Sequence, residues 1–186
     1  MANKQALREL QQRLAQRMQA AREQTQVASW LAVECAGLGL LFSLKQAAEI
    51  FTPVALKPVP YSQPWLAGVA NLRGGLFTVV DLAVFLGLRD GRDTSAAARA
   101  DLAQTRLVSL NPELNINCAL LVDRLLGLRG DDQLSPEPEA DVAASSAGVA
   151  RPKFAGPRLR DAAGQLWQQI DLEALAKHQQ FLRVVL

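Results

Sequence analysis

Short apolar segments follow one another from Ser29 onward, and each is closed by glycine, proline or polar residues. This pattern predicts an all-β domain. The expected strands of the first half are residues 30–36, 38–44, 48–54, 67–73 and 76–82. Five strands placed so closely along the chain favour a small β-barrel.

Glycine and proline mark the expected connections between these strands. Gly37 and Gly39 suit a tight hairpin between the first two strands, and Gly74 and Gly75 suit one between the last two, because glycine readily adopts the positive φ angles of such turns. The stretch PVALKPVPYSQP carries four prolines. Since proline cannot donate a hydrogen bond to a sheet, we expect an extended crossing there, outside the centre of the sheet.

The second half of the chain repeats the β pattern. Its expected strands are residues 105–111, residues 116–128 as one bent strand or two, and a hairpin within 158–171 that turns at 161–164. At 186 residues the chain is long enough for one sizeable core or two closely joined subdomains. We expect subdomain 1 at about residues 28–88 and subdomain 2 at about residues 104–186.

Two segments have the composition of connections rather than of strands. Residues 89–104 are charged, small and aperiodic, which predicts an exposed loop. Residues 131–141, DDQLSPEPEAD, contain five acidic residues and no basic one. Because such a composition buries little apolar surface, we expect an exposed, mobile connection.

Helices are expected at the two ends of the chain and after the fifth strand. Residues 1–27 are expected to form an N-terminal amphipathic extension, with apolar side chains at steps of three and four: Leu7, Leu10, Leu14, Met18 and Ala21. Five basic and two acidic residues leave the polar face of this helix positive. A short helix is expected to end at Gly87, and a C-terminal helix to begin after Asp171, with Leu172, Leu175 and Leu182 on its apolar face.

The chemistry-bearing residues do not form a catalytic, metal or cofactor constellation. Cys35 and Cys118 are far apart in apolar runs, which predicts buried free thiols. His178 is the one histidine and stands among glutamines, so a solvated surface side chain is favoured over a catalytic base. The sequence therefore predicts neither an enzyme nor a resident cofactor.

Charge and hydropathy bear on the partners. The 20 basic and 18 acidic residues are interspersed, which disfavours nucleic acid as a partner. No apolar run reaches the ~18 residues that a membrane helix needs, so we expect no direct membrane insertion and a cytoplasmic location.

The phrase NLRG interrupts the most apolar part of the chain, residues 65–82. Strand alternation places Val69, Asn71 and Arg73 on one face, and the two glycines that follow hold Arg73 at a rim. This arrangement favours a docking surface with Arg73 exposed. Carboxylates fall within or beside the predicted strands, where they end a strand or pair with an arginine: Glu34, Glu49, Asp81 and Asp123.

The segment PVPYSQPWLAGVANLRGGLFTVVDL closely resembles the signature of CheW-type chemotaxis coupling proteins. The matching residues are Gly68, Val69, Asn71, Leu72, Arg73 and Gly74, then Val79, Val80, Asp81 and Leu82. AEIFTP, with Glu49 and Ile50, is similar to a second family segment, and so are the closing hairpin and DLEAL. The resemblance extends over about residues 29–178.

This resemblance implies a mainly β fold of two five-stranded SH3-like barrels, to which the sequence pattern adds an N-terminal and a C-terminal helix. It implies a non-enzymatic adaptor between the cytoplasmic tip of a methyl-accepting chemoreceptor and the regulatory domain of a CheA-type histidine kinase, recruited to membrane-associated receptor arrays. Arg73 and Glu49 are implied to lie near each other, and the receptor-binding surface is expected in the groove between the subdomains. The implied protein-interaction residues are Glu49, Asn71, Leu72, Arg73, Gly74, Val80 and Asp81.

Two features depart from the family pattern. Thr78 stands where the family commonly has proline, and the N-terminal helix is similar to that of PilI-like members of type IV pilus twitching systems.

Two other functions compete with the adaptor. One alternative is a stand-alone regulatory or decoy domain that binds a kinase or response regulator without bridging to receptors. The other is a small-ligand-binding β domain, which requires a deep apolar pocket between the barrels.

Overall fold

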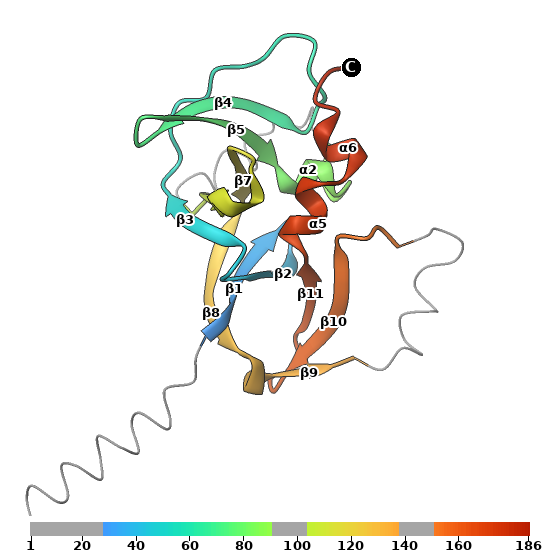
Figure 1. The fold of residues 1–186 in the computed structure, drawn as a ribbon. Helices are drawn as coiled ribbons and strands as arrows, with labels where there is room; N and C mark the ends of the chain where they lie inside the picture. The colour runs from blue at the N-terminus through green and yellow to red at the C-terminus, as the bar shows by residue number, and fades with distance from the viewer. Residues whose placement is uncertain (1–27, 91–103, 138–150) are drawn as a thin grey trace, which may run out of the picture.

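The computed structural model describes residues 28–90, 104–137 and 151–186, and in this part of the chain the fold is mainly β (Figure 1). The six-stranded sheet has the order β8 (Arg124–Gly130), β1 (Ala28–Cys35), β2 (Leu38–Ser43), β11 (Leu166–Ile170), β10 (Ala155–Asp161) and β9 (Leu134–Pro136). The five-stranded sheet has the order β3 (Ala47–Phe51), β6 (Arg106–Leu110), β7 (Cys118–Val122), β5 (Gly75–Asp81) and β4 (Leu66–Leu72). The expected two-part β architecture is confirmed.

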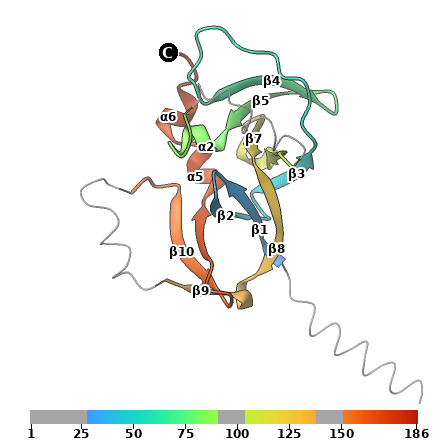
Figure 2. The same ribbon diagram turned by 180° about the vertical axis from the view of Figure 1, so that it is seen from behind.

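The strands are not grouped into the expected subdomains at residues 28–88 and 104–186. Each sheet takes strands from both halves of the chain, because β11 pairs in parallel with β2 and β7 pairs in parallel with β5. The chain leaves the six-stranded sheet after β2 and returns to it at β8. Figures 1 and 2 show the resulting arrangement, with the β4–β5 hairpin and β8 to β11 at opposite ends of the molecule.

The two predicted hairpins form with left-handed turn residues. Ala36 and Gly37 have φ of 49° and 80° between β1 and β2, and Arg73 and Gly74 have φ of 49° and 87° between β4 and β5. Two consecutive positive φ angles are the mark of a type I′ turn, whose twist matches that of the flanking strands. Each turn therefore begins at a non-glycine residue. Gly75, which was expected in the second turn, belongs to β5.

The proline-rich crossing runs outside the sheet, as expected, and forms one isolated β-bridge with β4 among the described residues. Lys57 and Val69 exchange two backbone hydrogen bonds, each with an N–O distance of 2.9 Å. Gly68 permits this approach, because a Cβ added there would lie 2.5 Å from the Lys57 carbonyl oxygen. Thr78 is also accommodated: its backbone N–H donates to the Asn117 carbonyl, a bond that proline cannot make.

Three short α-helices occur in the described residues: α2 (Leu82–Phe85), α5 (Leu172–Ala176) and α6 (Gln179–Leu182). Asp171 caps α5 by accepting hydrogen bonds from two backbone N–H groups, as expected. The predicted C-terminal helix is nevertheless broken before α6. Phe181 is consequently the buried residue of α6, whereas Leu182 is 55% exposed, so its expected burial was wrong.

The core joins the two sheets. Its largest cluster combines buried residues of both sheets and of all three helices, among them Phe42, Val80, Leu120, Leu172 and Phe181. Two smaller clusters lie within single sheets, one around Leu107 and Val79 and one around Trp167 and Leu41. The sheets are therefore held together by shared apolar packing.

The segments expected to be connections are partly described. Residues 131–137 were expected to be mobile, but Asp131–Gln133 forms a 3-10 turn and Leu134–Pro136 is strand β9. The Asp131 carboxylate accepts hydrogen bonds from Ser29 Oγ at 2.8 Å and from Trp30 Nε1 at 2.6 Å, which anchors the segment. The predicted helix in residues 1–27, the loop residues 91–103 and the connection residues 138–141 lie outside the described residues. No described helix is long and apolar enough to cross a membrane.

Candidate protein-interaction surface

Arg73 lies at the tip of the β4–β5 hairpin and forms an ion pair with Glu49 of β3. The distance from Arg73 Nη1 to Glu49 Oε2 is 2.6 Å, and the two side chains are 75% and 48% exposed. The Arg73 guanidinium also lies 5.7 Å from the ring centroid of Phe51. Since β3 and β4 are the two edges of the five-stranded sheet, these contacts close the sheet on itself.

Asn71 holds the turn that presents Arg73. Its side-chain carbonyl accepts a hydrogen bond of 2.8 Å from the backbone N–H of Gly74. Along β4, Asn71 is exposed whereas Ala70 and Leu72 are buried, in agreement with the predicted alternation. We refer to Glu49, Asn71, Arg73 and Gly74 as the hairpin-tip surface.

Three of the predicted interaction residues have internal roles instead. Leu72 and Val80 are 4% and 2% exposed, so neither can contact a partner directly. Leu72 is turned inward by the alternation along β4. Val80 lies on the interior strand β5, where the adjacent Val79 is buried as well. Asp81 caps α2 by accepting a hydrogen bond from the Val84 N–H and forms an ion pair of 2.9 Å with Arg89.

Arg89 was expected in an exposed loop, but it ties the two sheets together. It bridges Asp81, at the end of β5, and Asp123, which lies between β7 and β8. Asp123 also accepts a 2.6 Å hydrogen bond from the backbone N–H of Ala36 in the β1–β2 turn. Burial alone would lower the pKa of Arg89, but the two carboxylates outweigh burial and raise it. Only the fold could reveal this role, since the surrounding composition is that of a loop.

All four carboxylates singled out in the sequence pair with arginines. Besides the pairs of Glu49, Asp81 and Asp123, Glu34 lies 2.6 Å from Arg124. The two cysteines are buried and free, as expected, and burial raises the pKa of each thiol to about 12. In the described residues no cluster of three or more histidine, cysteine or acidic side chains has the geometry of a metal site.

His178 is not the solvated side chain that the sequence predicts. Its ring packs edge-on against Phe154, at 5.0 Å between centroids, and against Phe85, at 6.4 Å. The helix break between α5 and α6 turns it inward. It therefore belongs to an aromatic cluster at the junction of α2 and α6.

Comparison with known proteins agrees with the fold. Residues 29–180 match the CheW-like domain family. Protein PilI of Pseudomonas aeruginosa is 27% identical over 178 residues, which covers 92% of this chain and 88% of PilI. The crystal structure of the scaffolding protein TtCheW from Thermoanaerobacter tengcongensis superposes with a TM-score of 0.58 at 16% identity, and the match covers 77% of this chain and 88% of TtCheW.

The match to the family extends over most of the described residues. The match to the family begins in β1 and ends in α6, so it includes both sheets and the hairpin-tip surface. Because the match extends over well more than half of its residues, this chain belongs to the CheW-like domain family.

Proposed function

We propose that this protein is an adaptor that couples methyl-accepting chemoreceptors to a CheA-type histidine kinase. In this proposal it binds the cytoplasmic tip of the receptor and the regulatory domain of the kinase. The observation that carries the proposal is the exposed ion pair between Glu49 of β3 and Arg73, which stands on a turn fixed by Asn71. The adaptor works in the cytoplasm at membrane-associated receptor arrays.

The physical argument concerns what the exposed pair contributes. An exposed ion pair stabilises a fold by only about 0–1 kcal/mol, so stability alone is a weak reason to place one there. A charged group on a rigid turn, however, loses little conformational entropy when a partner binds. The hairpin tip thus offers a preorganised guanidinium and carboxylate to a partner surface.

The similarity to PilI bears on the pathway. PilI and this chain align over most of both lengths. On this basis we favour a chemosensory system that controls type IV pilus twitching over one that controls swimming.

The test is a binding assay with purified full-length protein, a receptor cytoplasmic fragment and the kinase regulatory domain. Arg73→Ala should weaken binding to one of these partners at least ten-fold while unfolding at nearly the same denaturant concentration. Arg129→Ala is the matched control, because Arg129 also lies over an aromatic ring, that of Trp167, but in the other sheet. It should leave both affinities unchanged.

A double-mutant cycle separates structural from interfacial roles. For Arg73→Ala and Glu49→Ala, we expect a coupling of about 0–1 kcal/mol in the free energy of unfolding. Unchanged affinity of Arg73→Ala for both partners would exclude the hairpin tip as the docking surface. Binding to the kinase without any binding to receptor would instead support the stand-alone regulatory domain.

A further inference from the structure

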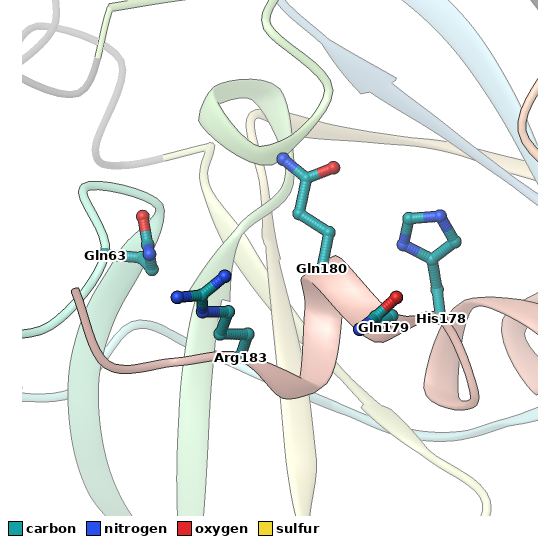
Figure 3. Close-up of a pocket in the computed structure, with 5 residues that line it drawn as sticks. All are labelled: Gln63, His178, Gln179, Gln180 and Arg183. Carbon is teal, nitrogen blue, oxygen red and sulfur yellow. The ribbon is translucent and has the colours of Figure 1, made fainter.

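Figures 1 and 2 show α6 beside the end of the β4–β5 hairpin that is farther from its turn. Two adjoining cavities flank this helix. One, of about 430 Å³, is polar and is lined by Gln63, His178, Gln179, Gln180 and Arg183 (Figure 3). The other, of about 480 Å³, is mainly apolar. His178 and Gln180 line both, so the cavities form one continuous depression, which we call the α6 groove.

The apolar part of the groove has a preformed floor and an exposed rim. Leu40, Phe85, Phe154 and Ile170 are each at most 8% exposed and line the floor. Leu88, which is 41% exposed, stands at the rim. A cavity of this size holds one or two large apolar side chains, and the rigid floor needs no rearrangement to receive them.

The polar part of the groove presents side-chain hydrogen-bond donors but no carboxylate to accept from them. Arg183, Gln179 and Gln180 make no side-chain hydrogen bond or ion pair with the described residues, and no acidic side chain lines either cavity. His178 Nδ1 is buried and lacks a hydrogen-bond partner among the same residues. In Figure 3 the Arg183 side chain extends toward Gln63. A carboxylate placed beside Arg183 would accept hydrogen bonds from its guanidinium.

The described residues and the N-terminal pattern do not offer a segment of this chemistry. The amphipathic pattern of residues 3–23 has five basic and two acidic residues, so it carries the same sign of charge as Arg183. On α5 the exposed Glu173 already pairs with Lys177 at 2.6 Å. A second copy of the chain therefore lacks an acidic amphipathic helix among its described residues.

We propose that the α6 groove binds an amphipathic helix of a partner protein that carries a carboxylate beside its apolar residues. The apolar side chains enter the cavity between Phe85 and Ile170, and the carboxylate pairs with Arg183. Helices that dock in this way place apolar residues three and four positions apart. Because the groove and the hairpin-tip surface lie at opposite ends of β4 and β5, the protein can hold two partners at once.

The test uses the full chain with methyl groups labelled for NMR and two synthetic 16-residue helical peptides. Both peptides carry leucine and phenylalanine three and four positions apart, and they differ only by glutamate or lysine one turn further on. The glutamate peptide should shift the Leu88 and Ile170 methyl signals saturably and bind at least ten-fold more tightly than the lysine peptide. Arg183→Glu should reverse this preference, and Leu88→Asp at the rim should abolish binding of both peptides.

Further measurements distinguish the binding of a partner helix in the α6 groove from the binding of other occupants there, and from partner binding at the hairpin-tip surface. Arg73→Ala should bind the glutamate peptide as the unmodified protein does, so loss of hairpin-tip binding and loss of groove binding are separate results. Failure of both peptides to bind would overturn the inference, as would equal affinity for both. Binding of indole-3-acetate without binding of either peptide would also overturn the inference, because the groove would then hold a small acid. So would a shift of the Leu88 methyl signal caused by Leu14→Asp alone, because the groove would then hold the chain's own N-terminal segment.

Discussion

Arg73 shows how one residue combines backbone strain with an exposed charge. Its φ of 49° lies in the left-handed region, where a non-glycine residue is disfavoured by about 1–2 kcal/mol. Asparagine or glycine would fit that turn position with less strain. The ion pair with Glu49 is too exposed to offset much of this strain. The strain alone does not mark a binding residue, because Ala36 adopts the same φ in the β1–β2 turn. In the proposed function it is the exposed guanidinium on this turn that meets the partner.

The two buried thiols make the free energy of unfolding depend on pH in the alkaline range. Burial raises the pKa of Cys35 and Cys118 from 9.0 to about 12, so the unfolded chain releases these protons at lower pH than the folded protein. Their contribution to stability is fully present below pH 9 and is lost as pH rises toward 12. We expect the free energy of unfolding, measured by urea melts, to fall between pH 8.5 and 10.5, and to fall less in a Cys35→Ala, Cys118→Ala variant. An equal decline in both proteins would contradict this account.

At the scale of elements, Arg89 joins the end of β5 to the β7–β8 junction. Arg89→Ala leaves Asp81 and Asp123 near each other without their shared cation. Because these groups are mostly buried, we expect a loss of about 2–3 kcal/mol in the free energy of unfolding. The control is Lys177→Ala, which removes an exposed pair on α5 and should cost only about 0.3–0.5 kcal/mol. Similar losses in the two variants would show that the Arg89 bridge is not a structural tie.

The contact between β4 and the proline-rich crossing depends on Gly68. A Cβ at Gly68 meets the Lys57 carbonyl, and the residue has φ of +144°. Gly68→Ala should therefore lower the free energy of unfolding by about 3 kcal/mol through strain and displacement of the crossing. Gly74→Ala, at φ of +87° with open space around it, should cost only about 1 kcal/mol. Thermal melts of both variants give the comparison, and a Gly68→Ala protein as stable as Gly74→Ala would argue against the close contact.

At the scale of the molecule, the two sheets share one core and are expected to unfold together. The largest cluster contains residues of both sheets, and each sheet contains strands from both halves of the chain. Separate fragments of residues 28–90 and 104–186 should each be unfolded by circular dichroism, since each lacks strands of both sheets. Mixed together, they should recover β structure. A fragment that folds alone would indicate an independent subdomain and contradict the shared core.

The local structure of this protein follows from its sequence, whereas its assembly follows from contacts between distant residues. Alternation, turn glycines and the Asp171 cap act within a few residues, and so the hairpins, the helix starts and the exposed face of the NLRG phrase were predictable. The parallel pairing of β2 with β11 and of β5 with β7 was not, because apolar strands of similar pattern can pair in many ways and loop length discriminates weakly among them. For the same reason only the tertiary structure decided that Arg89 bridges two aspartates, that Val80 is internal, and that His178 turns inward beside the α6 groove.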